Sequence, residues 1–185
     1  MYIGRVPAIS SWQTRANALT AIRLFAAPAL ALAICDGESG IAAALLFLAI
    51  GSDFADGWVA RRYGEASPLG GLIDHAVDAI FVTTGCAALA SVGVLPVVLP
   101  LLIAVAFLQY ALDSGASATR PLRASWLGRW NGILYYAAVG VPVVRDALGL
   151  GWPTPFAVAA FGWALVASTL FSISDRLLAA RAPRG

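Results

Sequence analysis

The chain has 185 residues, of which 60% are hydrophobic and only 12% are charged, and its mean hydropathy is +0.81. Soluble domains contain roughly half apolar and about a quarter charged residues, so this composition argues against a soluble enzyme. The net charge is only +2 and no run of basic residues points to a nucleic-acid partner. The length fits one domain, residues 1–185. Cys35 and Cys86 lie in or beside apolar segments and are expected as small hydrophobic residues rather than a disulfide.

Apolar segments of span length follow one another along almost the whole chain. A helix of about 20 apolar residues crosses the hydrocarbon core of a bilayer. The sequence therefore predicts an all-α membrane protein with six transmembrane helices, preceded by an interfacial segment at residues 1–16. The expected spans are about 17–34, 41–62, 69–94, 95–112, 130–144 and 156–173. They leave no room for a separate soluble domain.

All twelve basic residues are arginine, and their distribution predicts the orientation. With a cytoplasmic N-terminus, the outer loops hold only Arg145, and Arg23 lies inside the first span. This is a strong positive-inside bias, and Arg23 should snorkel to the surface or face a cavity. The remaining arginines fall on the inner side: Arg5, Arg15, Arg61, Arg62, Arg120, Arg123, Arg129, Arg176, Arg181 and Arg184.

Four aspartates stand inside apolar sequence at helical spacing. Asp53 and Asp56 are three residues apart, and Asp74 and Asp78 are four apart, so each pair shares one helix face. If their helices are antiparallel neighbours, the four carboxylates converge. Each would cost roughly 2.5–3.5 kcal/mol near the bilayer centre, and Arg61 can neutralise only part of the charge. The set therefore predicts one or two hard divalent ions, Mg²⁺ or Mn²⁺, held by all four aspartates.

These aspartates belong to a longer pattern, Asp53-x-x-Asp56-Gly57-x-x-Ala60-Arg61-x8-Gly70-x3-Asp74-x3-Asp78. It matches, at every specified position, the pattern that defines the CDP-alcohol phosphotransferases, which are integral membrane enzymes of phospholipid synthesis. The segment from Asn17 through Thr20 to Arg23 resembles the family's upstream N-L-L-T-x-x-R segment. Many members carry Pro or Ser where this chain has His75, and Lys where it has Ala79, so the subfamily stays open.

The resemblance implies transfer of a phosphatidyl-type group from a CDP-alcohol, typically CDP-diacylglycerol, to an acceptor hydroxyl with release of CMP. Asp78 would be the general base, and the four aspartates would hold the metal on the diphosphate. The residues implied to line the nucleotide pocket are Gly57, Ala60, Arg61, Gly70, Asn17 and Thr20. The resemblance also implies a homodimer in the cell (inner) membrane. The distribution of arginines predicts that the site opens to the cytoplasm. Glycerol 3-phosphate is the leading acceptor; inositol phosphate, serine and another phospholipid are alternatives.

Two other classes of membrane protein also place acids within spans. A membrane prenyltransferase would use aspartates with metal and diphosphate but release pyrophosphate, and an ion-coupled transporter would release no CMP. Gly57, Ala60 and Gly70 taken singly could be plain helix-packing residues, and Asn17 and Thr20 could simply start a helix.

Several other residues have two readings. His75 is expected to pack or hydrogen-bond rather than bind metal. Arg120, Arg123 and Arg129 could bind an acidic acceptor or set the topology. The aromatic residues Trp126, Trp130, Tyr135 and Tyr136 are expected as interface belt and packing.

Overall fold

The computed structural model describes residues 15–63, 68–116 and 126–181, which form six helices and no strand. The helices are α1 (Arg15–Cys35), α2 (Ser39–Tyr63), α3 (Pro68–Ser91), α4 (Val98–Ala116), α5 (Trp126–Ala147) and α6 (Pro155–Arg181). The expected all-α fold is therefore confirmed, and each helix overlaps one predicted span. The predicted interfacial segment at residues 1–16 lies almost wholly outside the described residues.

The helices differ in how clearly they qualify as membrane spans. They are 19 to 27 residues long, or about 28–40 Å at 1.5 Å per residue, against a hydrocarbon core of about 30 Å. Only Gly70–Ser91 and Pro155–Leu178 are both long and apolar enough to cross a membrane within the described chain. Shorter apolar stretches occupy Thr20–Cys35, Ser39–Ala55 and Val98–Leu112. Six spans therefore stays a prediction.

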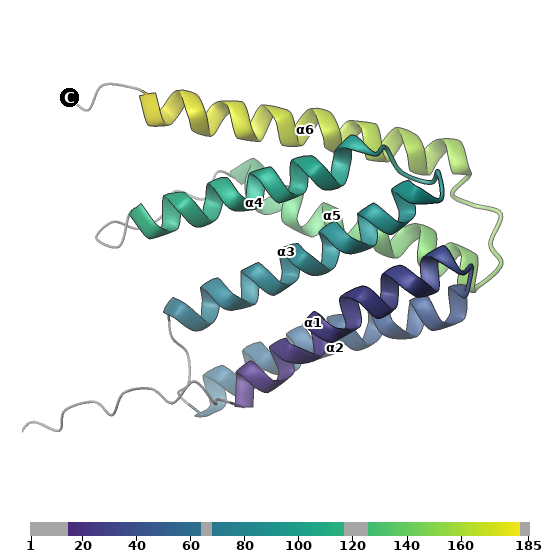
Figure 1. Cartoon of the computed structure of the whole chain (residues 1–185), viewed down its shortest axis with the longest axis horizontal. Coiled ribbons are helices and arrows are strands. Elements are labelled where there is room, and N and C mark those ends of the chain that lie inside the picture. Colours follow the sequence, from purple (N-terminus) through teal and green to yellow (C-terminus); the bar gives the residue numbers. More distant parts are fainter. Residues whose placement is uncertain (1–14, 64–67, 117–125, 182–185) are drawn as a thin grey trace, which may run out of the picture.

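The helices lie lengthwise in one bundle, with α3 near its middle (Figure 1). α1 packs against both α2 and α3, and α3 also contacts α4 and α5. α5 reaches α2 on one side and α6 on the other, and α4 packs on α6. Among the described residues, α2 and α3 share no comparable interface, so α1 mediates between them. The expectation that carboxylates from α2 and α3 meet therefore depends on α1.

Short glycine turns close one end of the bundle. Gly37 ends α1 with φ of 74°, and the amide of Glu38 donates to the carbonyl of Ala33 at 2.8 Å. This is the Schellman motif, in which glycine tolerates the left-handed conformation and the next amide reaches back to an open carbonyl. The same pattern ends α3 at Gly93 and α5 at Gly149. Three of the five connections therefore begin with a glycine turn, and all three lie at the same end of the bundle (Figure 1).

Small residues let the helices approach closely. The buried contacts of α1 and α2 include Ala26, Ala27, Ala42 and Ala49, and side chains of this size allow backbones to come near each other. At Gly162 of α6 an added Cβ would lie 2.6 Å from Cδ of Pro96 and 3.0 Å from Cδ2 of Leu95, the tightest such site among the glycines compared. α6 is thus pressed against the turn between α3 and α4.

Replacing Gly162 by alanine is expected to destabilise the protein by about 1–3 kcal/mol, because the new methyl overlaps a rigid proline ring. Thermal unfolding in detergent measures the effect. Gly132→Ala is the matched control, since a Cβ at that helical glycine meets nothing within 4 Å and alanine favours helix. Equal unfolding midpoints for the two variants would contradict this packing.

Candidate active site

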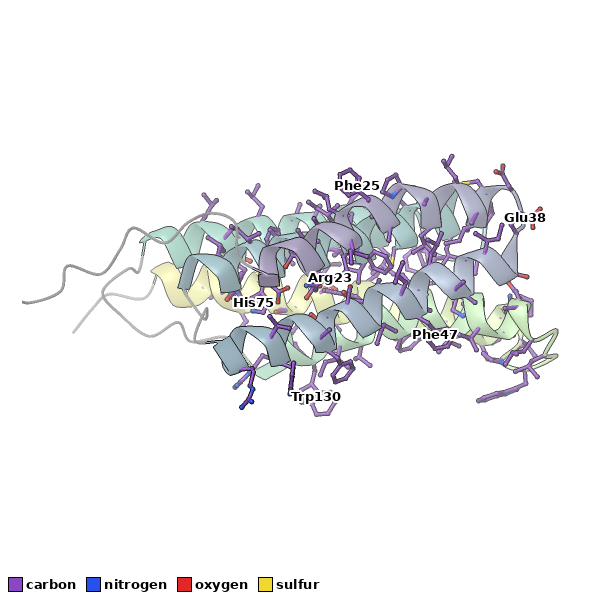
Figure 2. All side chains as sticks on the ribbon, turned by 90° about the horizontal axis from the view of Figure 1, so that it is seen from below. Arg23, Phe25, Glu38, Phe47, His75 and Trp130 are labelled. Carbon is purple, nitrogen blue, oxygen red and sulfur yellow. The ribbon has the colours of Figure 1, made fainter. Side chains whose placement is uncertain are left out.

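The candidate site is built around one arginine inside the bundle. Arg23 lies on α1 and its side chain is 0% exposed, the largest side chain buried to that extent. Figure 2 shows it between the helices, whereas Phe25 on the same helix points outward. Because α1 packs on both α2 and α3, its inward face is the place where side chains from those helices can meet. The expectation that Arg23 snorkels to the surface was wrong, because its side chain has no exposed surface.

Three of the four predicted aspartates meet at this guanidinium. Nη1 donates to Oδ1 of Asp53 at 2.8 Å and also to Oδ1 of Asp78. Nη2 donates to Oδ1 of Asp74. Asp74 and Asp78 reach it together because they stand four residues apart on one face of α3, and Asp53 comes from the second half of α2. The carboxylates keep 45%, 31% and 24% exposure for Asp53, Asp74 and Asp78, so a ligand can still reach them.

The charges of this cluster do not balance. Among the described side chains, three carboxylates face one guanidinium, which leaves two negative charges in excess in an apolar setting. Oxygen donors that converge with excess negative charge suit Mg²⁺ or Mn²⁺. Ligand atoms of Asp74, His75 and Asp78 also lie within 4.8 Å of one another. The donor set therefore fits a divalent ion.

The other predicted site residues lie on the same helices, but only some are described. Asp56, Gly57, Ala60 and Arg61 belong to α2, and their side chains lie outside the described residues, as does that of Asn17 on α1. Thr20 is buried on α1, one turn before Arg23. Gly70 lies on α3, one turn before Asp74. Both are thus near the cluster along their own helices.

His75 begins a chain of contacts that leads away from the cluster. Its ring meets that of Tyr110 on α4 edge to face, with centroids 5.8 Å apart. The guanidinium of Arg176 on α6 lies 5.7 Å from the centre of the same Tyr110 ring. His75 thus packs against an aromatic ring, as expected, and Tyr110 links it to Arg176 of α6.

The four aromatic residues of the predicted belt have different surroundings. Trp130 is exposed at 47%, Tyr135 is buried at 7%, and the side chain of Trp126 lies outside the described residues. Packing is not the whole role of Tyr136, because its hydroxyl donates to Oδ1 of Asp78 at 2.9 Å. Sequence inspection missed this residue, since nothing in the local pattern distinguishes it from Tyr135.

The structure describes only one of the three arginines in the polar connection predicted before the fifth span. Arg120 and Arg123 lie outside the described residues, and Arg129 is exposed on α5.

The role of Arg23 could have been inferred from the sequence. An arginine inside an apolar span needs an internal partner, and the aspartates are the acids available in neighbouring spans.

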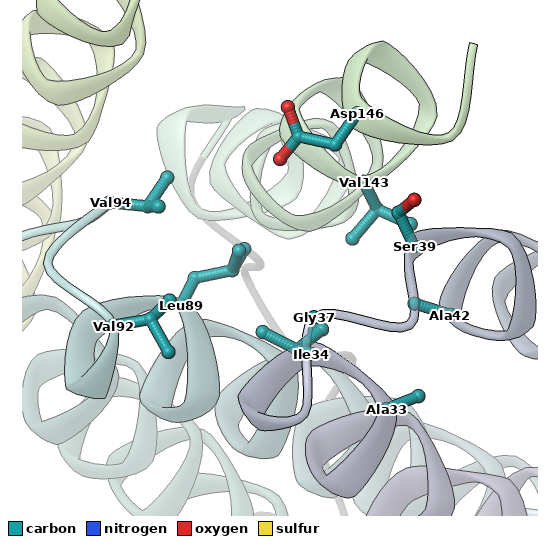
Figure 3. Close-up of a pocket in the computed structure, with 10 residues that line it drawn as sticks. All are labelled: Ala33, Ile34, Gly37, Ser39, Ala42, Leu89, Val92, Val94, Val143 and Asp146. Carbon is teal, nitrogen blue, oxygen red and sulfur yellow. The ribbon is translucent and has the colours of Figure 1, made fainter. Parts of the chain in front are cut away.

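A cavity of about 290 Å³ lies at the opposite end of the bundle, beside the glycine turns (Figure 3). Its walls are mainly aliphatic, including Ile34, Leu89 and Val143, and its acidic residue is Asp146. Nε of Arg145 donates to Oδ1 of Asp146 at 2.7 Å, so this carboxylate is already paired. The lining residues include none of the carboxylate cluster, so the cavity is separate from it.

Comparison with known proteins identifies the class of this site. No solved structure matches the chain. The family model for CDP-alcohol phosphatidyltransferase matches residues 13–175, which include Arg23, every aspartate of the cluster and both tyrosines of α5. The match covers most of the chain and the whole site. The chain therefore belongs to the CDP-alcohol phosphatidyltransferases, enzymes that transfer a phosphatidyl group from a CDP-alcohol to an alcohol.

Proposed function

We propose that this enzyme transfers the phosphatidyl group of CDP-diacylglycerol to a small acceptor hydroxyl, with glycerol 3-phosphate as the leading acceptor, and releases CMP. The observation that carries the proposal is the convergence of Asp53, Asp74 and Asp78 on Arg23 at the point where three helices meet. A diphosphate needs concentrated positive charge beside it, and carboxylates with excess negative charge can gather that charge as bound metal.

Each residue has a distinct task in this proposal. Asp53, Asp56, Asp74 and Asp78 would hold one or two Mg²⁺ or Mn²⁺ ions, which supply positive charge for the diphosphate and the leaving CMP. The pocket residues Gly57, Ala60, Arg61, Gly70, Asn17 and Thr20 would accommodate the nucleotide. Arg23 fixes the three described carboxylates relative to one another. Its two nitrogens hold three acids from two helices, so the geometry exists before any ligand arrives.

The reaction is an in-line displacement at the phosphorus that carries the diacylglycerol. Asp78 accepts the proton of the acceptor hydroxyl, and the acceptor oxygen forms a bond to that phosphorus. The bond between the phosphorus and the CMP oxygen breaks, and its electron pair leaves on CMP. Asp78 then passes the proton to water. General base catalysis of this kind contributes roughly 10²- to 10⁴-fold.

An anionic acceptor is supported by the contacts beyond His75. Arg176 lies over Tyr110, which in turn meets His75, the neighbour of Asp74 in sequence. A guanidinium suits a phosphate because its donors match the phosphate oxygens. An acceptor that carries a phosphate, such as glycerol 3-phosphate or inositol phosphate, would use this charge.

The membrane arrangement is part of the proposal. The arginine bias supports a cytoplasmic N-terminus and C-terminus with six spans in the inner membrane. On that arrangement the aspartate cluster lies in the inner leaflet and opens to the cytoplasm. A water-soluble acceptor could then enter from one side and a lipid donor from the bilayer. The domain is taken as the whole chain, 1–185, and it is proposed to act as a homodimer.

The first test is CMP release by detergent-purified protein with CDP-diacylglycerol, Mg²⁺ or Mn²⁺, and each acceptor in turn. Release is expected with one acceptor, to stop on chelation, and to fall at least about 100-fold in Asp78→Asn because the base is lost. Asp146→Asn is the matched control, since this acid lies in the separate cavity. Pyrophosphate as the released product would favour a prenyltransferase instead.

Loss of the positive charge at residue 23 should destabilise the metal-free protein. Removing one partner from a buried ion cluster costs roughly 3–5 kcal/mol, so Arg23→Gln is expected to lower the unfolding midpoint in detergent by about 10 °C. Mg²⁺ or Mn²⁺ should raise the midpoint of this variant more than that of the wild type, because more negative charge is uncompensated.

Arg145→Gln provides the comparison for that experiment. Arg145 is also a buried arginine with an aspartate partner, but it lies at the opposite end of the bundle. Its variant should show no added response to the divalent ion. An equal response in the two variants would rule out a special link between Arg23 and a metal site.

The acceptor phosphate is expected to use Arg176. Arg176→Gln should raise the KM for glycerol 3-phosphate roughly tenfold, about the loss of one charge-assisted hydrogen bond, with little change in the KM for CDP-diacylglycerol. Steady-state kinetics of CMP release measures both constants. If Arg129→Gln raises the acceptor KM and Arg176→Gln does not, the acceptor phosphate lies beside the connection that precedes α5 instead.

A further inference from the structure

The carboxylate of Asp78 accepts a hydrogen bond from α5, a helix that carries no residue of the aspartate motif. Tyr136 of α5 donates its hydroxyl to Oδ1 of Asp78 at 2.9 Å. Its ring stacks on that of Phe81, with centroids 6.0 Å apart and planes inclined by 21°. Phe81 is fully buried on α3, less than one turn after Asp78. The tyrosine ring is thus held by the helix whose carboxylate it contacts.

The hydrogen bonds to Asp78 fall on one of its two oxygens. Nη1 of Arg23 and the hydroxyl of Tyr136 both donate to Oδ1. Within the described part of the chain, no side chain donates to Oδ2. A carboxylate fixed through one oxygen cannot turn without breaking both bonds, so the orientation of the other oxygen is fixed as well. The side chain remains 24% exposed, which leaves room for a ligand to approach.

We propose that Tyr136 is a positioning residue for Asp78, an inference that rests on the proposed transferase reaction. Its O–H holds Oδ1, together with Arg23, so that Oδ2 is the oxygen that receives the proton of the acceptor hydroxyl. As that proton moves to Oδ2, the acceptor oxygen bonds to phosphorus and the electron pair of the breaking P–O bond leaves on CMP. Small displacements of a reacting group can cost as much as 100-fold in rate.

The neighbouring tyrosine supplies an internal comparison. Tyr135 differs from Tyr136 by one position on α5, and its hydroxyl lies 2.8 Å from Oγ1 of Thr169 on α6. Tyr135 is buried and Tyr136 is partly buried, and both are hydrogen-bonded aromatic residues, but the hydroxyl of Tyr135 serves packing between α5 and α6. Removing either hydroxyl deletes one oxygen atom from the same helix. Only the loss at Tyr136 should reach the reaction.

The test compares Tyr136→Phe with Tyr135→Phe in the full-length protein in detergent. For Tyr136→Phe we expect kcat to fall by about 10- to 100-fold, with the KM values for CDP-diacylglycerol and acceptor within about twofold. Tyr135→Phe should keep the wild-type kcat. A purely structural role would change the unfolding midpoint and both KM values, not kcat alone.

Two outcomes would overturn the inference, and a third would overturn the proposed function on which it rests. Wild-type kcat in Tyr136→Phe would show that the hydroxyl does not position the base. An equal loss of kcat in both tyrosine variants would assign the effect to packing of α5. Failure of the wild-type protein to release CMP with any acceptor would instead refute the proposed function on which the inference rests, and that outcome is visible before either variant is made.

Discussion

The structure depends on one buried cluster of opposite charges. Arg23 has no exposed surface and touches carboxylates from two other helices. Neither sign could remain there alone, because a single charge in a low-dielectric interior costs several kcal/mol. The cluster therefore constrains where α1, α2 and α3 can lie relative to one another. The same constraint places three acids at one point, and such a set of oxygen donors suits a hard divalent cation.

The sequence allowed a good part of this to be predicted. Apolar runs of span length located six helices, because only helices and closed barrels satisfy the backbone in lipid. Helical spacing alone put Asp74 and Asp78 on one face, and the structure brings both to Arg23. The motif identified the family independently of any coordinates.

What the sequence did not reveal were partners chosen across the bundle. Arg23 is separated from its three acids by 30, 51 and 55 residues, and periodicity within one helix says nothing about such pairs. Arg61 was the arginine expected to share the charge because it is near in sequence. Tyr136 was harder still, since a tyrosine in an apolar helix usually packs, and only the position of α5 brings its hydroxyl to Asp78.

The order of synthesis gives the arginine of α1 a further consequence. Arg23 is made before any of its partners, and on the proposed six-span arrangement α1 enters the membrane with a charge that costs roughly 2.5–3.5 kcal/mol at the centre of a lone helix. Asp53 and then Asp74 and Asp78 follow on α2 and α3. The first helix is therefore poorly matched to lipid until two more have been inserted. On that arrangement, the first three helices form the smallest unit in which Arg23 meets the described carboxylates of the cluster.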